Sequence, residues 1–306
     1  GQFVFFMKFA VINDLHAHFD PGSKATGYLE ANRRAEWMLG QFEKGGSMTD
    51  VDFVILAGDM IHGENLPTIT TEMKAFKERL DRLVLPYYPV CGNHEIQQAE
   101  GNADYEQPYR DAFGDDRFDY VIPAGPVEIV VLNNAGTFHV TKERREERYL
   151  ALKRLLATRP KVPKILVCHI PLLCVRDHDV LEESFGFISY RCLDRELLDL
   201  VEAPGSPVKL VISGHLHLTG MTERKGIKHL STAGTASFPH DYALLEITND
   251  DIQIEVCNLP EYLHEPASNI HGPPRYPEGY TDEAHFSHQT YLCGAAAERS
   301  FKIPLK

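Results

Sequence analysis

Short apolar runs that end in polar side chains constrain the fold of this chain more than any other feature of its sequence. Residues 52–57 and 208–212 show the pattern, since each run has the length of a strand and is almost entirely apolar. Such a run is typical of a strand that is covered on both faces, because a strand with one face in water alternates apolar and polar residues. Segments with helical periodicity lie between several runs, at 28–44, 67–83 and 142–158. This alternation predicts a layered α/β fold.

The other expected elements follow from the same patterns. Strands are predicted at 3–12, 52–57, 85–90, 127–132, 164–168 and 208–212, and two or three antiparallel strands at 227–231, 243–247 and 252–256. A further helix is predicted at 194–201. Residues 99–119 are polar, aromatic and acidic, which predicts a surface excursion with one short helix, and residues 172–193 are expected to form an inserted loop.

The change of composition near residue 258 suggests how the chain is divided. A chain of 306 residues can bury a large core as one domain with insertions, and we expect residues 1–257 to form that domain. Residues 258–306 are rich in Pro, Gly, Tyr and His and have no sustained period. They are predicted to form an extension that packs on the domain as a strap or is partly disordered. Met7 is a candidate natural start, with residues 1–6 as an added leader.

The overall charge and the cysteines narrow the expected partners. A net charge of −13 repels polyanions, so nucleic acid is not the expected partner, although bound metal ions can make a cleft attractive to a small anion. The six cysteines form no CxxC pair and mostly follow or lie within apolar runs. This pattern predicts buried thiols in a reducing compartment, and hence a cytoplasmic protein. The apolar residues 3–7 lack the length of a membrane span and the basic flank of a signal peptide, so no membrane association is expected.

Two of the polar clusters have the spacing of metal ligands. Asp14 and His16 are separated by one residue, as are His215 and His217, so in an extended backbone both side chains of each pair leave the same face. Either pair can clamp one divalent ion or lie on either side of two. Taken alone, an Asp-x-His pair is more often a solvated turn. A Gly-His-x-His that closes an apolar strand already favours a metal, because two crowded imidazoles gain little otherwise.

The other three clusters are weaker evidence when each is taken alone. Gly58-Asp59 is usually a turn, and His169 before a proline is more often a hydrogen-bonded core histidine. Residues 92–95 place an amide, an imidazole and a carboxylate at one strand end, and these groups are costly to desolvate unless they are paired or bound to metal. All five clusters fall at carboxyl ends of predicted strands, where α/β sheets gather their ligand sites. We therefore expect one shared site.

Read in order, the five clusters are D-x-H, G-D, G-N-H-[DE], H and G-H-x-H. This ordered pattern resembles that of the calcineurin-like metallophosphoesterases, and a match in five blocks is highly specific. The resemblance covers residues 3–256 and leaves residues 258–306 outside. It implies a four-layer α/β/β/α sandwich in which two mixed sheets carry a dinuclear metal site at the carboxyl ends of their strands.

The resemblance also implies the ligands of two metal ions, with Asp59 as the bridge and each of its carboxylate oxygens facing one ion. The other ligands form two sets, Asp14, His16 and His217 at one position and Asn93, His169 and His215 at the second. A water or hydroxide shared between the ions would be the nucleophile. Mixed imidazole and carboxylate ligands suit Mn, Fe or Zn ions, divalent or trivalent, better than Ca.

Further residues receive roles in the reaction from the same resemblance. His94 is expected to point at the substrate and to stabilise or protonate the leaving oxygen. Glu95 is expected to hold the imidazole of His94, and the alternative is a surface residue without a role. His18 and His62 are weaker candidates for contacts with substrate, since a solvated loop histidine is equally compatible with the sequence.

Departures from other branches of the superfamily narrow the expected substrate. Residues 58–62 lack the metal-ligating tyrosine of purple acid phosphatases and the Asp-Arg-Gly of protein serine/threonine phosphatases. His94 stands where lipid-A precursor hydrolases typically have arginine. The chain looks most similar to cyclic-nucleotide and related small phosphodiesterases, which implies hydrolysis of a small phosphodiester.

Three alternatives remain open. Residues 58–65 also resemble the second motif of double-strand-break-repair nucleases, but no basic stretch is present to bind DNA. A nucleotide diphosphatase or phosphomonoesterase of the same superfamily would use the same residues. A scaffold that binds metal without catalysis is the least expected, because no ligand of the pattern is missing.

Overall fold

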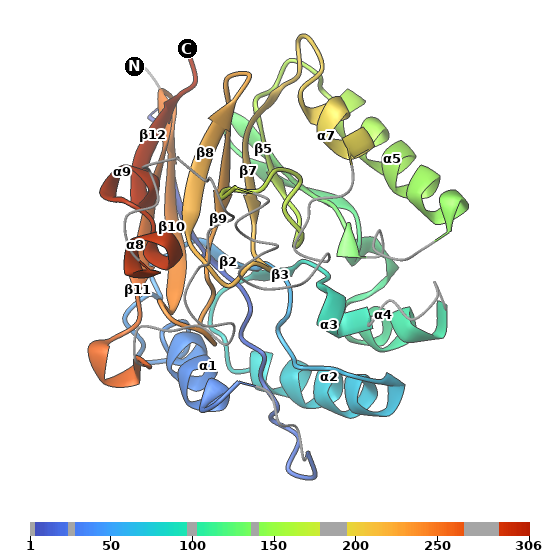
Figure 1. Ribbon diagram of the computed structural model, residues 1–306, viewed down its shortest axis with the longest axis vertical. Coiled ribbons are helices and arrows are strands. Elements are labelled where there is room, and N and C mark those ends of the chain that lie inside the picture. Colours follow the sequence, from blue (N-terminus) through green and yellow to red (C-terminus); the bar gives the residue numbers. More distant parts are fainter. Residues whose placement is uncertain (1–3, 24–27, 97–102, 136–140, 178–194, 266–287) are drawn as a thin grey trace, which may run out of the picture.

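The computed structural model describes residues 4–23, 28–96, 103–135, 141–177, 195–265 and 288–306. Two six-stranded sheets face each other at the centre of the molecule, and helices cover the outer face of each sheet (Figure 1). The layer order is therefore α/β/β/α, which confirms the fold that the resemblance implied.

The first sheet has the strand order β12-β11-β10-β1-β2-β3. Strand β1 pairs in parallel with β2 and antiparallel with β10, so the sheet is mixed. Helices α1 and α2 cover its outer face (Figure 1). The bounds of these elements are β1 Phe6–Ile12, β2 Phe53–Leu56, β3 Tyr87–Pro89, β10 Asp241–Thr248, β11 Asp251–Asn258, β12 Ser300–Pro304, α1 Ala31–Gly40 and α2 Leu66–Leu80.

The second sheet has the order β4-β5-β6-β7-β9-β8 and is also mixed. Helices α5 and α7 cover its outer face, while α3 and α4 lie near α2, and α8 and α9 near β8 (Figure 1). The bounds are β4 Tyr120–Ala124, β5 Val127–Val131, β6 Lys164–Val167, β7 Val208–Ser213, β8 Gly220–Arg224, β9 Ile227–Ser231, α3 Asn93–Ile96, α4 Gln107–Phe113, α5 Lys142–Ala157, α7 Arg195–Val201, α8 His288–Cys293 and α9 Ala296–Arg299.

The core explains why the central strands are apolar throughout. Side chains alternate across a strand, so Phe9 and Val11 of β1 pack between the two sheets, whereas Ala10 and Ile12 pack under α1 and α2. Both faces of β1 are thus buried, as in the other interior strands. A continuous apolar run is the sequence that such a strand requires.

The parallel strands bring the polar clusters to one edge of the sandwich. Strands β1, β2 and β3 run in parallel in the first sheet, as do β5, β6 and β7 in the second. The five clusters directly follow β1, β2, β3, β6 and β7. At this edge the backbone N–H of Ala236, beyond β9, donates to the carbonyl oxygen of Asp14, beyond β1, over 3.1 Å. A backbone hydrogen bond therefore ties the two sheets together beside the predicted ligands.

The structure differs from the expected elements in three ways. The helix expected at 28–44 is the shorter α1, which ends at Gly40, a poor helix former. Strands β4, β8 and β12 were not predicted, because they are short and partly polar. The surface excursion with one short helix expected at 99–119 is confirmed in part, since its described residues include α4 and are mostly exposed or half-buried, but Tyr109 and Phe118 are buried in the core under α2.

The two described parts of the predicted extension, residues 258–265 and 288–306, have defined structure. Strand β12 pairs antiparallel with β11 and forms the edge of the first sheet.

Among the described cysteines, Cys91 and Cys168 are buried, but Cys174, Cys257 and Cys293 are half-buried, so the expectation of buried thiols holds only in part. Across the described residues, none of the helices combines the length and the apolar character that a bilayer span requires.

The burial of Tyr109 gives a test of the corrected assignment. Tyr109→Ala should lower the free energy of unfolding by about 3–5 kcal/mol, as aromatic truncations in cores do, measured by urea denaturation. Tyr262→Ala is the matched control, because its ring is 64% exposed, and should change stability by less than about 1 kcal/mol. Equal effects of the two substitutions would contradict a core position for Tyr109.

Candidate metal centre

The backbone turns at the strand ends are left-handed rather than extended. Asp14 and His16 have φ of +46° and +45°, and buried Leu15 lies between them. The expectation that an extended backbone projects both side chains from one face is therefore wrong. Positive φ recurs at most of the predicted ligands, namely Asp14, His16, Asp59, His215 and His217. Non-glycine residues in this region cost about 1–3 kcal/mol each and persist only where the surroundings fix them, often at functional sites.

Backbone hydrogen bonds continue beyond β1 and β2 and fix these turns. The N–H of Asp14 donates to Gly58 O over 2.9 Å, and the N–H of His16 donates to Asp59 O over 3.0 Å. Gly58 has φ of +92°, and a Cβ there would lie 2.2 Å from Nδ1 of His169. Glycine is required at this position both by its φ and by the close approach of a predicted ligand.

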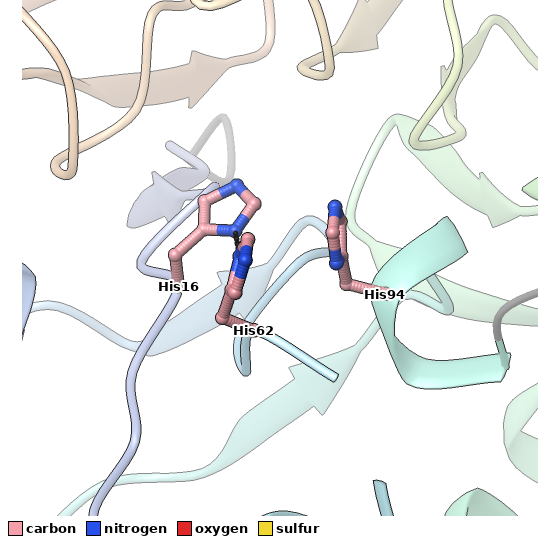
Figure 2. A group of neighbouring side chains, drawn as sticks. All are labelled: His16, His62 and His94. Carbon is pink, nitrogen blue, oxygen red and sulfur yellow. Dashed lines mark hydrogen bonds between the residues drawn. The ribbon is translucent and has the colours of Figure 1, made fainter. Parts of the chain in front are cut away.

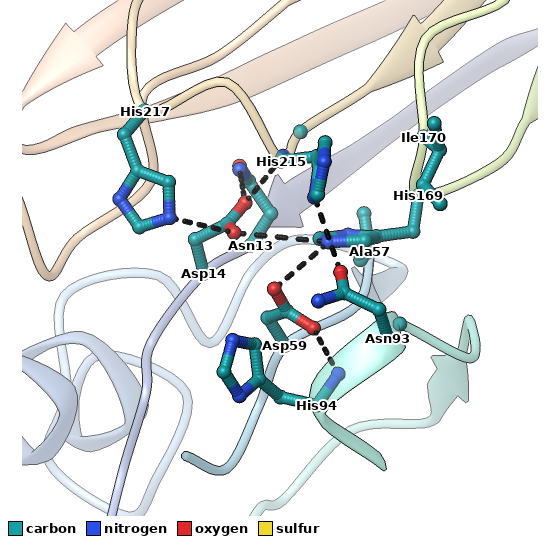
Figure 3. A network of polar contacts seen from close by, with 12 residues as sticks. Asn13, Asp14, Ala57, Asp59, Asn93, His94, His169, Ile170, His215 and His217 are labelled. Carbon is teal, nitrogen blue, oxygen red and sulfur yellow. Dashed lines mark hydrogen bonds and ion pairs between the residues drawn. The ribbon is translucent and has the colours of Figure 1, made fainter. Parts of the chain in front are cut away.

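The first donor group is Asp14, His16 and His217, whose ligand atoms lie together as expected (Figure 3 shows Asp14 and His217). Oδ1 of Asp14 is 3.5 Å from Nε2 of His16 and 3.3 Å from Nε2 of His217, and the two Nε2 atoms are 3.2 Å apart. Tetrahedral ligands about 2.1 Å from a cation are about 3.4 Å from one another. The three separations therefore fit donors that share one cation.

The remaining contacts of Asp14 leave one oxygen available. Its Oδ2 accepts hydrogen bonds from Nδ2 of Asn13 (2.5 Å) and the backbone N–H of His215 (3.1 Å). Its Oδ1 is fully buried and accepts no hydrogen bond from the described residues, although imidazole nitrogens surround it. A buried acceptor in this state is costly unless a cation satisfies it, so the residues present fit a metal ion.

The second donor group is Asp59, His169 and His215, with Asn93 beside them (Figure 3). Nε2 of His169 lies 3.0 Å from Oδ2 of Asp59, and Nδ1 of His215 lies 3.1 Å from Oδ1 of Asn93. Nδ1 of His169 lies 2.9 Å from Ala57 O, a contact that orients the ring so that Nε2 faces the carboxylate. The structure thus brings together all seven residues that the sequence proposed as ligands.

Asp59 lies between the two groups, as expected of a residue shared by both. Its Oδ1 accepts a hydrogen bond from the backbone N–H of His94 over 2.9 Å. Its Oδ2 faces one member of each group, His169 at 3.0 Å and His16 at 3.8 Å. Oδ2 of Asp59 thus lies near imidazoles of both groups, as Oδ1 of Asp14 does, and the expectation that each carboxylate oxygen of Asp59 faces one ion stays a prediction.

Burial and charge shift the pKa values at this site in opposite directions. Burial would raise the pKa of Asp14 and Asp59, but the neighbouring His169 and other imidazoles hold both pKa values below the ordinary range. Burial would lower the pKa of His169, yet the two carboxylates raise it to about 10. For His16 burial dominates and lowers the pKa to about 3, so its Nε2 is a neutral donor. The two carboxylates and the neutral imidazole of His16 are ligands that Mn, Fe and Zn prefer, whereas His169 must release its proton to bind a cation.

The expected pairing of Glu95 with the His94 ring is wrong. Oε1 of Glu95 accepts hydrogen bonds from the backbone N–H groups of Asp59 (2.7 Å) and Gly92 (2.9 Å). The alternative of a surface residue is excluded too, because Glu95 is fully buried. Burial, followed by the charge of Asp59, raises the pKa of Glu95 well above its usual range. Glu95 therefore holds the turns that carry Asp59 and Asn93.

His94 and His62 lie side by side next to His16 (Figure 2). Nδ1 of His94 is 2.9 Å from Gly63 O, and its ring stacks on His62 with centroids 4.6 Å apart. Nδ1 of His62 is 2.9 Å from Nδ1 of His16. The structure thus places His62 at the site, whereas the Nδ1 of His18 faces the carbonyl oxygen of His16 at 3.3 Å, away from the donor atoms of both groups.

Sequence patterns missed several residues that touch the ligands. The ring of Tyr28 stacks on His217 with centroids 4.8 Å apart, and its Oη lies 3.4 Å from Nε2 of His217. The hydroxyl of Ser237 contacts Nδ1 of His217 at 2.8 Å, and Asn13 holds Asp14. Asn13 could have been predicted, because it directly precedes Asp14 of the first motif. Tyr28 and Ser237 could not, because neither adjoins a motif.

Two donor groups that meet at one buried carboxylate, at the edge of an α/β/β/α sandwich, define a dinuclear metallohydrolase. The model of the calcineurin-like phosphoesterase family matches residues 7–218. The chain belongs to this family, whose members depend on two metal ions and hydrolyse phosphoester bonds. Comparison with curated protein sequences returned no significant match.

Solved structures with similar folds share little sequence with this chain. A dimetal phosphatase from Danio rerio is 16% identical with a TM-score of 0.58, over 82% of this chain and 95% of that chain. A purple acid phosphatase from yellow lupin (Lupinus luteus) is 16% identical with a TM-score of 0.57, over 83% of this chain and 51% of the lupin chain. GAP50, the anchor in the inner membrane complex of Plasmodium, is 16% identical with a TM-score of 0.53, over 83% of this chain and 84% of the GAP50 chain. These similarities concern the fold.

The position of Asp59 between the groups predicts that both metal positions depend on it. Asp59→Asn should lose both bound Mn²⁺ ions, because the neutral amide is a weaker ligand, whereas asparagine still tolerates the positive φ. Metal content after equilibrium dialysis measures the effect. Asp81→Asn, at an exposed carboxylate just after the end of α2, should keep both ions. Retention of both ions by Asp59→Asn would show that Asp59 is not shared.

The contacts of Glu95 predict a contrast between two substitutions. Glu95→Gln keeps an oxygen acceptor for the two backbone N–H groups and should change the free energy of unfolding by less than about 1 kcal/mol. Glu95→Ala leaves both N–H groups unpaired and should cost about 1–3 kcal/mol for each. Urea denaturation compares the variants. Equal losses would mean that the two hydrogen bonds do not carry the role of Glu95.

Proposed function

We propose that this protein hydrolyses a small phosphodiester, such as a cyclic nucleotide, with two metal ions bound at the donor groups. The observation that carries the proposal is the meeting of the two groups at Oδ2 of Asp59, with the imidazole of His94 beside them. Bound there, the two cations supply an activated water and charge stabilisation for displacement at phosphorus.

The protein side chains have separate tasks in this reaction. The seven predicted ligands would hold the two cations at the edge of the sandwich. The imidazole of His94, which Gly63 O positions through Nδ1, donates a proton or a hydrogen bond to the leaving oxygen. His62 stacks on His94 and keeps the plane of that ring fixed. The role of His62 is thus to position His94, and the prediction that it contacts substrate stays untested.

The charge balance supports a diester over a monoester. Two divalent ions supply four positive charges and Asp14 and Asp59 supply two negative charges, which by simple counting leaves about two positive charges before the hydroxide nucleophile is counted and about one after it. Within the described residues, neither carboxylate contacts an arginine or a lysine. A phosphodiester carries one negative charge and needs no further cation, whereas the doubly charged monoester is commonly held by arginine or lysine as well.

Other expectations from the sequence stay predictions. Mn, Fe or Zn suits the donor set, and the choice among them is untested. A small phosphorylated substrate rather than nucleic acid agrees with the net charge of −13. The cytoplasmic location and the lack of membrane association are untested predictions. The scaffold alternative stays open, since GAP50, whose fold is similar, is described as an anchor. The complete donor set and His94 favour an enzyme here.

The proposal predicts activity towards bis-(p-nitrophenyl) phosphate with added Mn²⁺, and loss of that activity with EDTA. His94→Ala should keep both metal ions and lower kcat by about 10²-fold, as the loss of a general acid does. His264→Gln, a histidine in contact with Leu259 O away from the site, is the control and should keep full activity. If His94→Ala instead loses the metal ions, the assigned role of His94 is wrong.

A comparison of substrates in one assay separates the alternatives. Cyclic nucleotides, linear dinucleotides, nucleotide diphosphates, phosphomonoesters and DNA should be offered at equal concentration, and kcat/KM compared. The proposal expects the highest kcat/KM for a small diester. Preference for DNA would favour the nuclease, and preference for a monoester or a diphosphate would favour the phosphatase alternatives.

A further inference from the structure

The turn that carries His217 is enclosed from outside by the C-terminal segment, residues 288–304. This segment comprises α8, α9 and β12 and lies beyond the region that the family model matches (Figure 1). Leu216 and Leu218, on either side of His217, are fully buried and pack in one cluster with Tyr291 and Leu292 of α8. The two leucines therefore face the C-terminal segment, while His217 faces the metal centre.

Thr219, two residues beyond His217, is held through every polar group it has. Its N–H donates to Leu292 O over 2.7 Å, and its carbonyl oxygen accepts from Nη2 of Arg176 over 3.0 Å. Its hydroxyl donates to Oδ2 of Asp241 and accepts from the N–H of Ala233 over 3.0 Å. Thr219 is fully buried, so loss of any of these partners would leave a polar group unsatisfied.

The carboxylate of Asp241 connects Thr219 to the C-terminal segment. Arg299 donates to both oxygens of Asp241, at 2.8 and 2.9 Å, and Asn258 donates to Oδ1 over 2.7 Å. Asp241 is fully buried, and a two-point contact with a guanidinium fixes the orientation of the carboxylate. Arg299 also donates to Cys293 O over 2.8 Å, which ties it to the end of α8.

A second ion pair holds the same segment from the other side. Nη1 of Arg176 lies 2.6 Å from Oε1 of Glu298, and its Nε donates to Tyr291 O over 3.0 Å. The same Glu298 accepts from the N–H of Met221 in β8 over 3.2 Å. Arg176 thus connects the carbonyl oxygen of Thr219 directly to α8 and α9.

These contacts explain how His217 is kept in an unfavourable conformation. His217 has φ of +56°, which a histidine adopts only where its surroundings fix it. Its own side chain is oriented by Ser237 at 2.8 Å, but that contact does not hold the backbone. The backbone is fixed on its C-terminal side by Thr219, and through Thr219 by Asp241 and Arg299.

We propose that the C-terminal segment positions His217 for metal binding, through the contacts from Arg299 to Asp241 and from Asp241 to Thr219. Arg299, Asp241 and Thr219 are thus positioning residues for the Asp14–His16–His217 group. This inference rests on the metal binding that the proposed function requires. The second group depends less on the segment, because His215 is held by its own N–H on Asp14 and because Gly214 donates to His169 O.

Titration of the metal-free protein with Mn²⁺ tests the proposal without an activity assay. Isothermal titration gives the affinity at each position, and electron paramagnetic resonance separates isolated ions from coupled pairs. Arg299→Met should weaken one of the two positions by about 10- to 100-fold, the usual effect of losing a group that orients a ligand. The electron paramagnetic resonance spectrum of Arg299→Met with one equivalent of Mn²⁺ should match that of His217→Ala rather than that of His169→Ala. Arg299→Lys should restore part of the affinity.

Two further variants keep the result interpretable. Thr219→Val is the substitute test in case Arg299→Met does not fold. It removes only the hydroxyl, leaves Arg299 and Asp241 paired, and should weaken the same metal position. Lys302→Met, in β12 of the same segment, removes an exposed ion pair with Asp251 and should leave both affinities unchanged.

The outcomes separate this inference from the proposed function. A wild-type protein that binds no Mn²⁺ would overturn the proposed function, and the inference with it. A wild-type protein that binds two ions, together with Arg299→Met and Thr219→Val variants that bind both as tightly, would overturn the inference alone. An equal loss of Mn²⁺ affinity at both positions would also overturn the inference, since the C-terminal segment would then support the fold in general.

Discussion

Two buried carboxylates, Asp14 and Asp59, set the requirements that the rest of the site meets. Burial of an anion is costly unless opposite charge or hydrogen bonds compensate for it. In the described residues both carboxylates meet imidazoles and backbone N–H groups, and each has one oxygen occupied by a backbone amide. The other oxygens, Oδ1 of Asp14 and Oδ2 of Asp59, face the imidazole nitrogens of both groups. A pair of cations completes this balance of charge, so the fold and the metal site are parts of one electrostatic arrangement.

The cost of that arrangement is spread over backbone that is fixed in unfavourable conformations. Asp14, Asp59 and His217 all have positive φ, and the glycines near them leave no room for a side chain. A Cβ at Gly214, for example, would lie 2.3 Å from Oδ2 of Asp14. Glu95 stabilises these turns by accepting two backbone hydrogen bonds, although its own carboxyl is buried and has a raised pKa. Rigid turns of this kind hold ligands in place before the metal arrives, which is how a site avoids reorganising during catalysis.

The interior strands could be predicted from local pattern, and the seven candidate ligands from five motifs whose order resembles that of the family. A strand buried on two faces must be apolar, and Asp-x-His or His-x-His at its end is visible without a structure. Edge strands β4, β8 and β12 were missed because their sequences are mixed and, among the described residues, each pairs with a strand on one side only. The contact of Glu95 was assigned wrongly because sequence proximity to His94 gave no indication of which backbone groups lay closer in space. Tyr28 was missed for the same reason, since only tertiary structure brings its ring to His217.

The five ligand-bearing turns do not receive equal support from the sandwich. Those after β1, β2, β6 and β7 extend from interior strands, and the turn after β3 continues directly into α3. The turn after β7 is different, because the chain passes from His217 into β8, an edge strand whose last residues are exposed. An edge strand has hydrogen-bonding partners on one side only, so it cannot by itself hold a strained turn beside it. The buried contacts of Thr219 with Leu292 and Asp241 supply the support that the sandwich lacks at this point. A chain that places its last metal ligand next to a sheet edge must therefore cover that edge, and here α8 and α9 do so.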